Sequence, residues 1–193
     1  MKIKPFKAFR FNARVVGDPG TCIAPPYDVI DEAAQQQLYD RNAYNIVRAI
    51  KGRQTARDSQ TDNVYTRAAD YLNRAVADGA LQDEDNEAIY VYVQDFEIAG
   101  TAYERTGIIA LGGLTPLGEG VQPHEKTLEG PKADRLNLTR ATACQLGQIF
   151  MLYDDPERRV DEILDRYGCE EWECGSCSIS EPCLGTAIVL EAL

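Results

Sequence analysis

The sequence predicts an α+β fold with a mixed sheet, in which a β-hairpin over about 88–114 is flanked by several helices. Two observations support this prediction. Apolar side chains recur at helical spacing between Val64 and Val76, and two runs rich in β-branched and aromatic residues flank Ala99-Gly100, where a hairpin should turn. Helices interleaved with a hairpin are typical of an α+β domain.

The N-terminal part of the chain is predicted to contain extended segments, a stiff turn and a helix. Residues 3–12 are extended, and the prolines of the Pro-Pro-Tyr-Asp turn at 25–28 restrict the backbone there. Asp31 can cap a helix over about 32–41. The short apolar run at 44–50 is predicted to be a strand.

The clearest helix follows Ser59 and Asp62, whose spacing resembles a capping box. Gly79 is a natural residue to end this helix, because glycine adopts the left-handed conformation without strain. We expect the helix to pack in the core and to have no direct chemical role.

The rest of the chain is predicted to form a helix over 131–146, a strand over 148–153 and a helix over 156–167. The composition then changes. Residues 1–168 are predicted to be one domain, and residues 169–193 a weakly structured tail rich in cysteine.

Charge and hydropathy exclude several classes of function. The net charge of −11 disfavours nucleic acid and anionic membranes as partners, because neutralising phosphates requires a surplus of Lys and Arg. No run of 18 apolar residues is present, so no transmembrane helix is expected. The basic N-terminus lacks the apolar core of a signal peptide, and we expect a cytoplasmic protein.

Reactive side chains gather most densely at His124-Glu125-Lys126, which includes the one histidine of the chain. His124 or Glu125 could act as a general base or acid, since histidine titrates near neutrality and burial can raise a glutamate toward it. Lys126 could neutralise a developing phosphoryl charge. The alternative is a structural histidine in a polar loop.

The helix that starts near Pro131 is a candidate anion site. Free N–H groups and the helix dipole favour an anion at such an end, and Gly130, Lys132 and Arg135 could hold a phosphate there. The alternative is a solvated basic face. On a helical wheel Arg140 falls among apolar residues, so its guanidinium should extend out to solvent, pair with a carboxylate or reach a ligand.

Two further features have weaker support. Asp28, in the turn at 25–28, could add a carboxylate to the site; the alternative is that the tetrapeptide is only a rigid corner. Four cysteines of the tail are spaced partly like iron–sulfur ligands, but the fourth is misplaced for that pattern. We expect no metal site, and capture of zinc or iron is the alternative at Cys169, Cys174, Cys177 and Cys183.

Several segments together resemble the DUF1015 family, a bacterial and archaeal domain of unknown function. They occur in order over roughly residues 2–156, and are Ile3-Lys4-Pro5-Phe6, Ala24-Pro25-Pro26-Tyr27-Asp28-Val29-Ile30, Tyr44-Asn45, His124-Glu125-Lys126-Thr127, Gly130-Pro131-Lys132-Ala133-Asp134-Arg135-Leu136, Ala141-Thr142 and Ile149-Phe150. The resemblance implies a distant similarity to the ParB/sulfiredoxin superfamily, which includes nucleotide-dependent enzymes and a free-serine kinase. It also implies a second half, with a Gly-His-His-Arg type motif, that this chain does not contain.

The resemblance implies the N-terminal part of a nucleotide-dependent small-molecule kinase with a role in serine or amino-acid metabolism. Its cofactors would be ATP or ADP with Mg²⁺, its partner a small metabolite, and this part alone should be inactive. The alternative is a non-catalytic ligand-binding or regulatory domain, in which the polar residues form ion pairs. The apolar end at 184–193 favours a homodimer.

Overall fold

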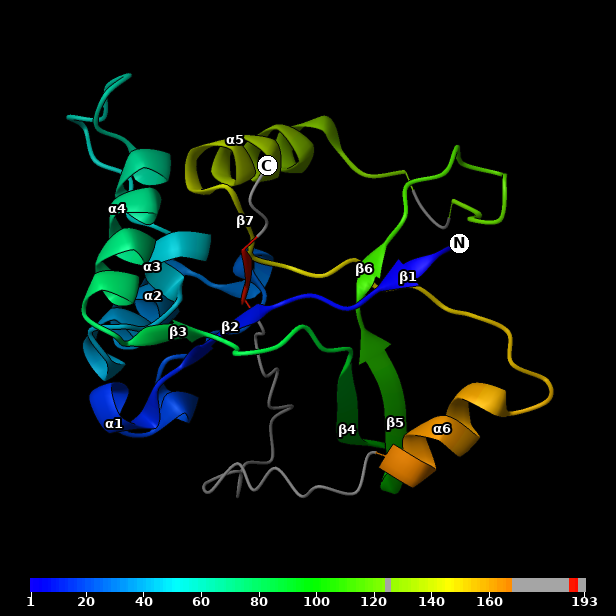
Figure 1. Ribbon diagram of the computed structural model, residues 1–193. Coiled ribbons are helices and arrows are strands. Elements are labelled where there is room, and N and C mark those ends of the chain that lie inside the picture. The colour runs from blue at the N-terminus through cyan, green and yellow to red at the C-terminus, as the bar shows by residue number, and fades with distance from the viewer. Residues whose placement is uncertain (124–125, 168–187, 191–193) are drawn as a thin grey trace.

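The computed structural model describes residues 1–123, 126–167 and 188–190. Figure 1 shows a layer of helices on one side of the molecule and a long β-hairpin with a single helix on the other. The first two strands, β1 (Ile3–Lys4) and β2 (Ala8–Phe11), run between these two parts. The α+β prediction is confirmed.

The strands form three small sheets, in which the pairings among described residues are antiparallel. β1 pairs with β6 (Leu111–Gly112). The second sheet has the order β3-β2-β8-β7, with β3 at Leu81–Asp83, β7 at Cys144–Gln145 and β8 at Ile188–Leu190. This sheet joins the two ends of the described chain to the helical layer.

The predicted hairpin is confirmed and forms the third sheet. β4 (Tyr90–Ile98) pairs with β5 (Thr101–Ile109) along its whole length. Ala99 and Gly100 make the turn with φ of 51° and 82°. Two consecutive residues with positive φ are what a tight hairpin turn needs to match the twist of its strands.

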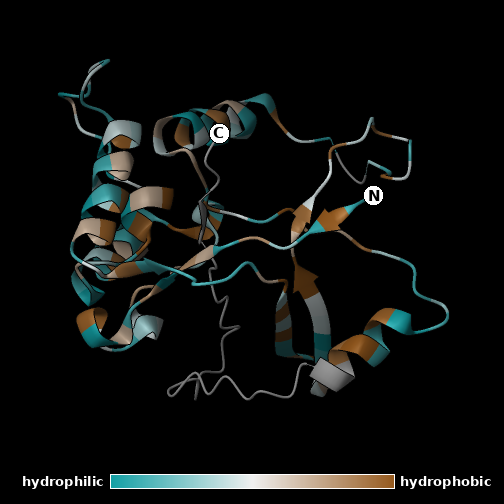
Figure 2. Ribbon diagram, viewed as in Figure 1, coloured by the Kyte–Doolittle hydropathy of each residue, from teal (hydrophilic) through white to brown (hydrophobic). Residues whose placement is uncertain are grey.

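The helical layer contains most of the core. Its elements are α1 (Ala13–Val16), η1 (Pro19–Thr21), η2 (Tyr27–Val29), α2 (Glu32–Arg41), α3 (Val47–Ile50), α4 (Val64–Ala77) and α5 (Glu129–Thr142), and α6 (Arg159–Tyr167) lies apart from them beside the hairpin. Asp31 caps α2 through its carboxylate, as predicted. In Figure 2, α4 shows alternating hydrophobic and hydrophilic bands, consistent with one buried face.

The capping of α4 differs in one detail from the prediction. Asn63, and not Ser59, is the N-cap: its side chain accepts from the N–H groups of Tyr65 and Thr66, and the Thr66 hydroxyl accepts from the Asn63 N–H. The Ser59 hydroxyl instead closes the turn before the helix by accepting from Asp62 N–H. Gly79 follows the helix with a φ of 70°, as expected.

The predicted strand at 44–50 is wrong, because Val47–Ile50 forms the short helix α3. Asn45 explains the difference. It is fully buried, its amide donates to the carbonyls of Thr21 and Ile23, and its Oδ1 accepts from Val47 N–H. A short apolar run does not distinguish a strand from a buried helical turn, and this tertiary contact decides for the helix.

Two boundaries near the C-terminal side also differ. α5 begins at Glu129, so Pro131 is its third residue, and the helix ends at Thr142 because Ala143 adopts a φ of 52°. The predicted strand at 148–153 is wrong: no strand is formed there, and side chains such as Leu152 are largely exposed. Phe150 lies against the Arg105 guanidinium, 4.8 Å from its ring centre, but the segment pairs with no strand among the described residues, so strand propensity alone does not form a strand.

One continuous core supports the helical layer. Ile46, Val47, Ala68, Leu72 and Leu81 are almost completely buried in it, and α4 packs against α3 and α5. No helix within the described part of the chain is long and apolar enough to cross a membrane.

Candidate functional site: an arginine-lined pocket

The predicted catalytic segment is only partly described. His124 and Glu125 lie outside the described residues. Lys126 and Gly130 are both exposed, on the approach to α5 and in its first turn. Asp28 is exposed in η2.

The charged residues of α5 are oriented differently from the helical-wheel prediction. Arg140 is exposed, so its predicted inward position is wrong. Leu136, on the face that was expected to be buried, is 49% exposed, whereas Leu138 is 4% exposed. The helix instead buries Leu138 in the core and directs Arg135 toward the Ile50 carbonyl at the end of α3. Lys132 is exposed and pairs with Glu129 at 3.1 Å.

Arg135 is held by the fold itself. Its guanidinium donates to Asp134 (Nε–Oδ2 2.9 Å) and to the Ile50 carbonyl at 3.2 Å, and it lies 3.9 Å from the centre of the Tyr27 ring. Asp134 in turn accepts from the Tyr65 hydroxyl at 2.9 Å. We call Tyr27, Tyr65, Asp134 and Arg135 the motif cluster.

The motif cluster connects four elements: η2, the end of α3, the start of α4, and α5. Burial and the hydrogen bond to Asp134 raise the pKa of Tyr65. The Tyr27 and Arg135 segments, far apart in the sequence, therefore meet. Their contacts join parts of the fold, and a role for Arg135 in binding phosphate stays a prediction.

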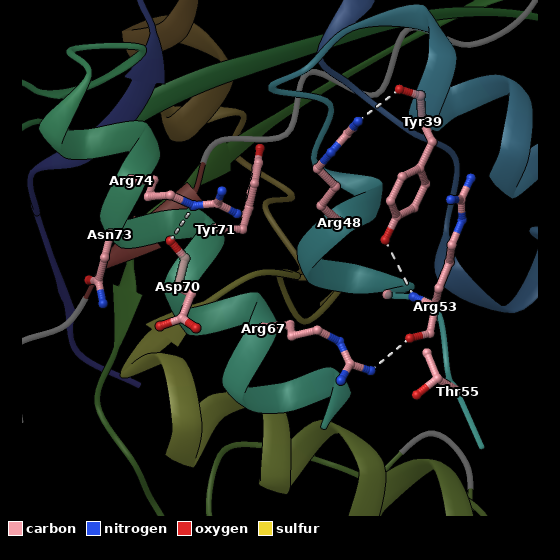
Figure 3. Close-up of a pocket in the computed structure, with 10 residues that line it drawn as sticks. Tyr39, Arg48, Arg53, Thr55, Arg67, Asp70, Tyr71, Asn73 and Arg74 are labelled. Atoms are coloured by element: carbon pink, nitrogen blue, oxygen red, sulfur yellow. Dashed lines mark hydrogen bonds between the residues drawn. The ribbon is translucent and has the colours of Figure 1, made fainter. Parts of the chain in front are cut away.

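A cavity of about 710 Å³ lies between α4 and the segment from α2 to the loop after α3. Figure 3 shows the side chains that line it. Four of them are arginines. The lining residues are Tyr39, Arg48, Gly52, Arg53, Thr55, Arg67, Asp70, Tyr71, Asn73 and Arg74. We call this cavity the arginine pocket.

Two of the arginines enclose an aromatic ring. The guanidinium carbons of Arg48 and Arg53 lie 4.4 Å and 4.0 Å from the centre of the Tyr39 ring, and Figure 3 shows the ring between them. Such cation–π contacts hold long side chains in place without neutralising their charge. Arg48 also donates to the carbonyls of Tyr39 and Asn42, at 2.8 Å and 2.9 Å.

Arg67 orders the loop that forms one wall of the pocket. It pairs with Asp58 at 2.9 Å and with Asp62 at 2.6 Å, and donates to the Arg53 carbonyl at 2.8 Å. Hydrogen bonds from Thr55 and from Arg67 lower the pKa of Asp58. Because two carboxylates pair with Arg67, its charge is compensated within the fold.

The opposite wall is formed by α4. Arg74 Nε makes one long hydrogen bond, 3.3 Å, to the Asp70 carbonyl. The Tyr71 hydroxyl donates to the Tyr44 carbonyl at 2.6 Å, and burial raises the pKa of Tyr71 well above its ordinary value. Tyr71 therefore contributes an uncharged side chain to this wall. Most of the N–H donors of Arg74 remain available to a ligand.

The electrostatic balance of the arginine pocket favours an anion. Within the described part of the chain, Arg48, Arg53 and Arg74 make no salt bridge with a carboxylate. Their contacts are carbonyls, the Gln36 amide and an aromatic ring. Asp70 is the one acidic residue in the lining. These guanidinium groups make the pocket locally positive, although the net charge of the chain is −11.

Sequence reasoning missed this pocket. Arg67 and Arg74 lie two helical turns apart and share one face of α4, which was a detectable signal. Arg48 was not detectable in the same way, because the incorrect strand at 44–50 gave no reason to place it beside α4. The described part of the chain contains no group of three or more side chains that could hold a metal ion. The four cysteines of the tail lie outside that part.

A family model described as "Protein of unknown function (DUF1015)" matches residues 3–174. No curated protein and no solved structure matches the chain.

Proposed function

The chain belongs to the DUF1015 family, whose description names no activity, and we propose from its geometry that it binds a small phosphate-bearing metabolite in the arginine pocket. The observation that carries this proposal is the set of three guanidinium groups, from Arg48, Arg53 and Arg74, that make no salt bridge with a carboxylate of the described residues. Guanidinium groups bind phosphate through planar pairs of donors. This is the ligand-binding alternative of the sequence analysis, at a different place on the chain.

The size of the pocket supports a small organic ligand over a bare ion. Its volume of about 710 Å³ lies within the range of roughly 300–1,000 Å³ that is usual for metabolite sites. Arg53 and Arg74 are the arginines with the most donors left for a ligand. Arg48 contributes charge from a fixed position, because its donors are directed to two backbone carbonyls.

The second candidate function is the phosphotransferase half that the family resemblance implies. One observation favours it: Asp70 lies in the lining beside the arginines. Mg²⁺ in such enzymes is held by one or two carboxylates together with substrate phosphates, so Asp70 would supply the carboxylate and the arginines the phosphate contacts. The metal would offset phosphate charge, and His124 or Glu125 would act on the acceptor hydroxyl of an amino acid such as serine.

The arrangement of Tyr39 weighs against a nucleotide. Arginines cover both faces of its ring, which leaves no face of this ring for a base to stack on. Tyr71 is buried and its hydroxyl is engaged. The described pocket therefore suits the phosphate of a ligand better than an adenine.

The test is calorimetry of the purified chain with inorganic phosphate, with ADP and with ATP, each with and without Mg²⁺ and serine. We expect phosphate-bearing ligands to bind, and Arg53→Gln and Arg74→Gln to weaken them at least about tenfold, or ~1.4 kcal/mol. Arg14→Gln is the matched control, since Arg14 is exposed on α1 outside the pocket. An equal loss in the control, or no binding by any ligand, would refute the proposal. Tighter binding of ATP than of phosphate, with Mg²⁺ and serine increasing it, would favour the phosphotransferase.

A further inference from the structure

A second cavity of about 280 Å³ adjoins the arginine pocket. Its lining residues are Ala43, Tyr44, Arg48, Tyr71, Arg74 and Asp78. Arg48, Tyr71 and Arg74 line both cavities and so form their common boundary. We call the smaller cavity the annex. A ligand that is bound by Arg74 is in reach of both spaces.

The charges along this face of α4 alternate in sign. Asp70, Arg74 and Asp78 are spaced four residues apart, which places them on one side of the helix. Successive members are separated by about 6 Å along the helix axis, at ~1.5 Å per residue. The annex therefore offers a carboxylate about one helical turn beyond the guanidinium of Arg74.

Asp78 contributes a carboxylate to the annex. Its Oδ2 accepts from the Tyr44 hydroxyl at 3.0 Å, and it makes no salt bridge among the described residues. This hydrogen bond is the main reason that the pKa of Tyr44 is raised. An ionised carboxylate accepts at two oxygens with about four lone-pair sites, so one donor from Tyr44 leaves most of that capacity for a ligand.

Building on the proposed function, we infer that the metabolite has two functional ends: a phosphate bound in the arginine pocket and a hydrogen-bond donor, hydroxyl or ammonium, bound by Asp78 in the annex. Arg74 lies between the two ends. Asp78 is exposed, and a simple alkyl phosphate would displace water from its carboxylate without replacing the hydrogen bonds that the water makes. Preference for the donor-bearing ligand follows from that difference.

The experiment compares three probes that share a five-carbon chain: pentyl phosphate, 5-hydroxypentyl phosphate and 5-aminopentyl phosphate. In calorimetry with the whole chain, at least one donor-bearing probe should bind about fivefold or more tightly than pentyl phosphate. Asp78→Ala should remove that preference, whereas Asp95→Ala, an exposed aspartate on the hairpin, should keep it. Asp78→Asn separates the two donors, because loss of charge affects the ammonium probe more than the hydroxyl probe.

The outcomes distinguish this inference from the proposed function. Equal affinity for the three probes would overturn the inference and leave phosphate binding intact. No binding of any probe would overturn both. If Asp78→Ala is poorly folded, Tyr44→Phe replaces it: this variant keeps Asp78 and removes its competing donor, so the preference should persist or grow, and its loss would count against the inference.

Discussion

Arg135 and Arg74 both extend from long helices of the same layer, yet they have different partners. Arg135 donates to Asp134 and to the Ile50 carbonyl and lies against Tyr27. Arg74 has one long bond to a backbone carbonyl. The first arginine belongs to a segment that was singled out as a candidate site, and the second lies on a helix for which no chemical role was expected. A charged residue in a prominent motif can thus stabilise the fold, while the charge that is available to a ligand lies elsewhere.

The motif cluster and the arginine pocket can be separated by experiment, since the first should control stability and the second binding. Arg135→Ala should have the largest effect on stability. It leaves Asp134 without its cation and removes the link to α3, and we expect the free energy of unfolding to fall by about 2 kcal/mol. Urea denaturation would measure this fall, and calorimetry should show phosphate affinity within about twofold of wild type. Intact stability with lost phosphate binding would reverse our assignment.

A smaller effect is expected for Arg67→Gln, which acts on the loop beside the pocket. The change removes the pairs with Asp58 and Asp62 and the hydrogen bond to the Arg53 carbonyl. Global stability should fall by about 1 kcal/mol. Hydrogen exchange in a peptide covering 53–63 should become faster, and the same peptide in Arg74→Gln should not change. Unaltered exchange in Arg67→Gln would show that the loop is ordered by other contacts.

Arg74→Gln should change stability by no more than about 0.5 kcal/mol, because the side chain is exposed and makes one long hydrogen bond. Its effect should instead be on ligand-induced stabilisation. Phosphate should raise the Tm of the wild type in proportion to its binding, and should raise that of the variant much less. A marked loss of stability without ligand would place Arg74 with Arg135 as a structural residue.

The smallest effect concerns pH and Asp58. Its pKa in the folded chain is lowered from its ordinary value of 3.8, so its contacts with Thr55 and Arg67 stabilise the fold above that value and are lost as the pH falls below it. The decrease in Tm between pH 5 and pH 3 should therefore be smaller in Asp58→Asn than in wild type. Equal decreases in both proteins would indicate that Asp58 does not contribute to the acid sensitivity.

Elements with strong local signals were predictable. The hairpin was marked by β-branched and aromatic runs around Ala99-Gly100, and α2 by the cap at Asp31. The long helix α4 was marked by its apolar spacing, although its cap is Asn63. These features depend on residues that are close in sequence, so the pattern contains the information.

The candidate site was only partly predictable. Sequence patterns singled out the Tyr27 and Arg135 segments. The contact between them could not be predicted, because the two residues are more than a hundred positions apart and no periodic pattern links them. Arg48 joins the pocket because buried Asn45 turns 47–50 into a helix. The ligand roles of Lys126, Lys132 and Arg140 stay predictions.

By itself, the sequence determined the fold class, the hairpin, the principal helices and the net negative charge, because local propensity and apolar periodicity act over a few residues. The tertiary structure alone decided which arginines pair with groups of the protein and which remain available to a ligand. That choice depends on the carboxylates and carbonyls that packing brings within reach: Asp134 and Ile50 reach Arg135, Asp58 and Asp62 reach Arg67, and no carboxylate of the described chain pairs with Arg53 or Arg74.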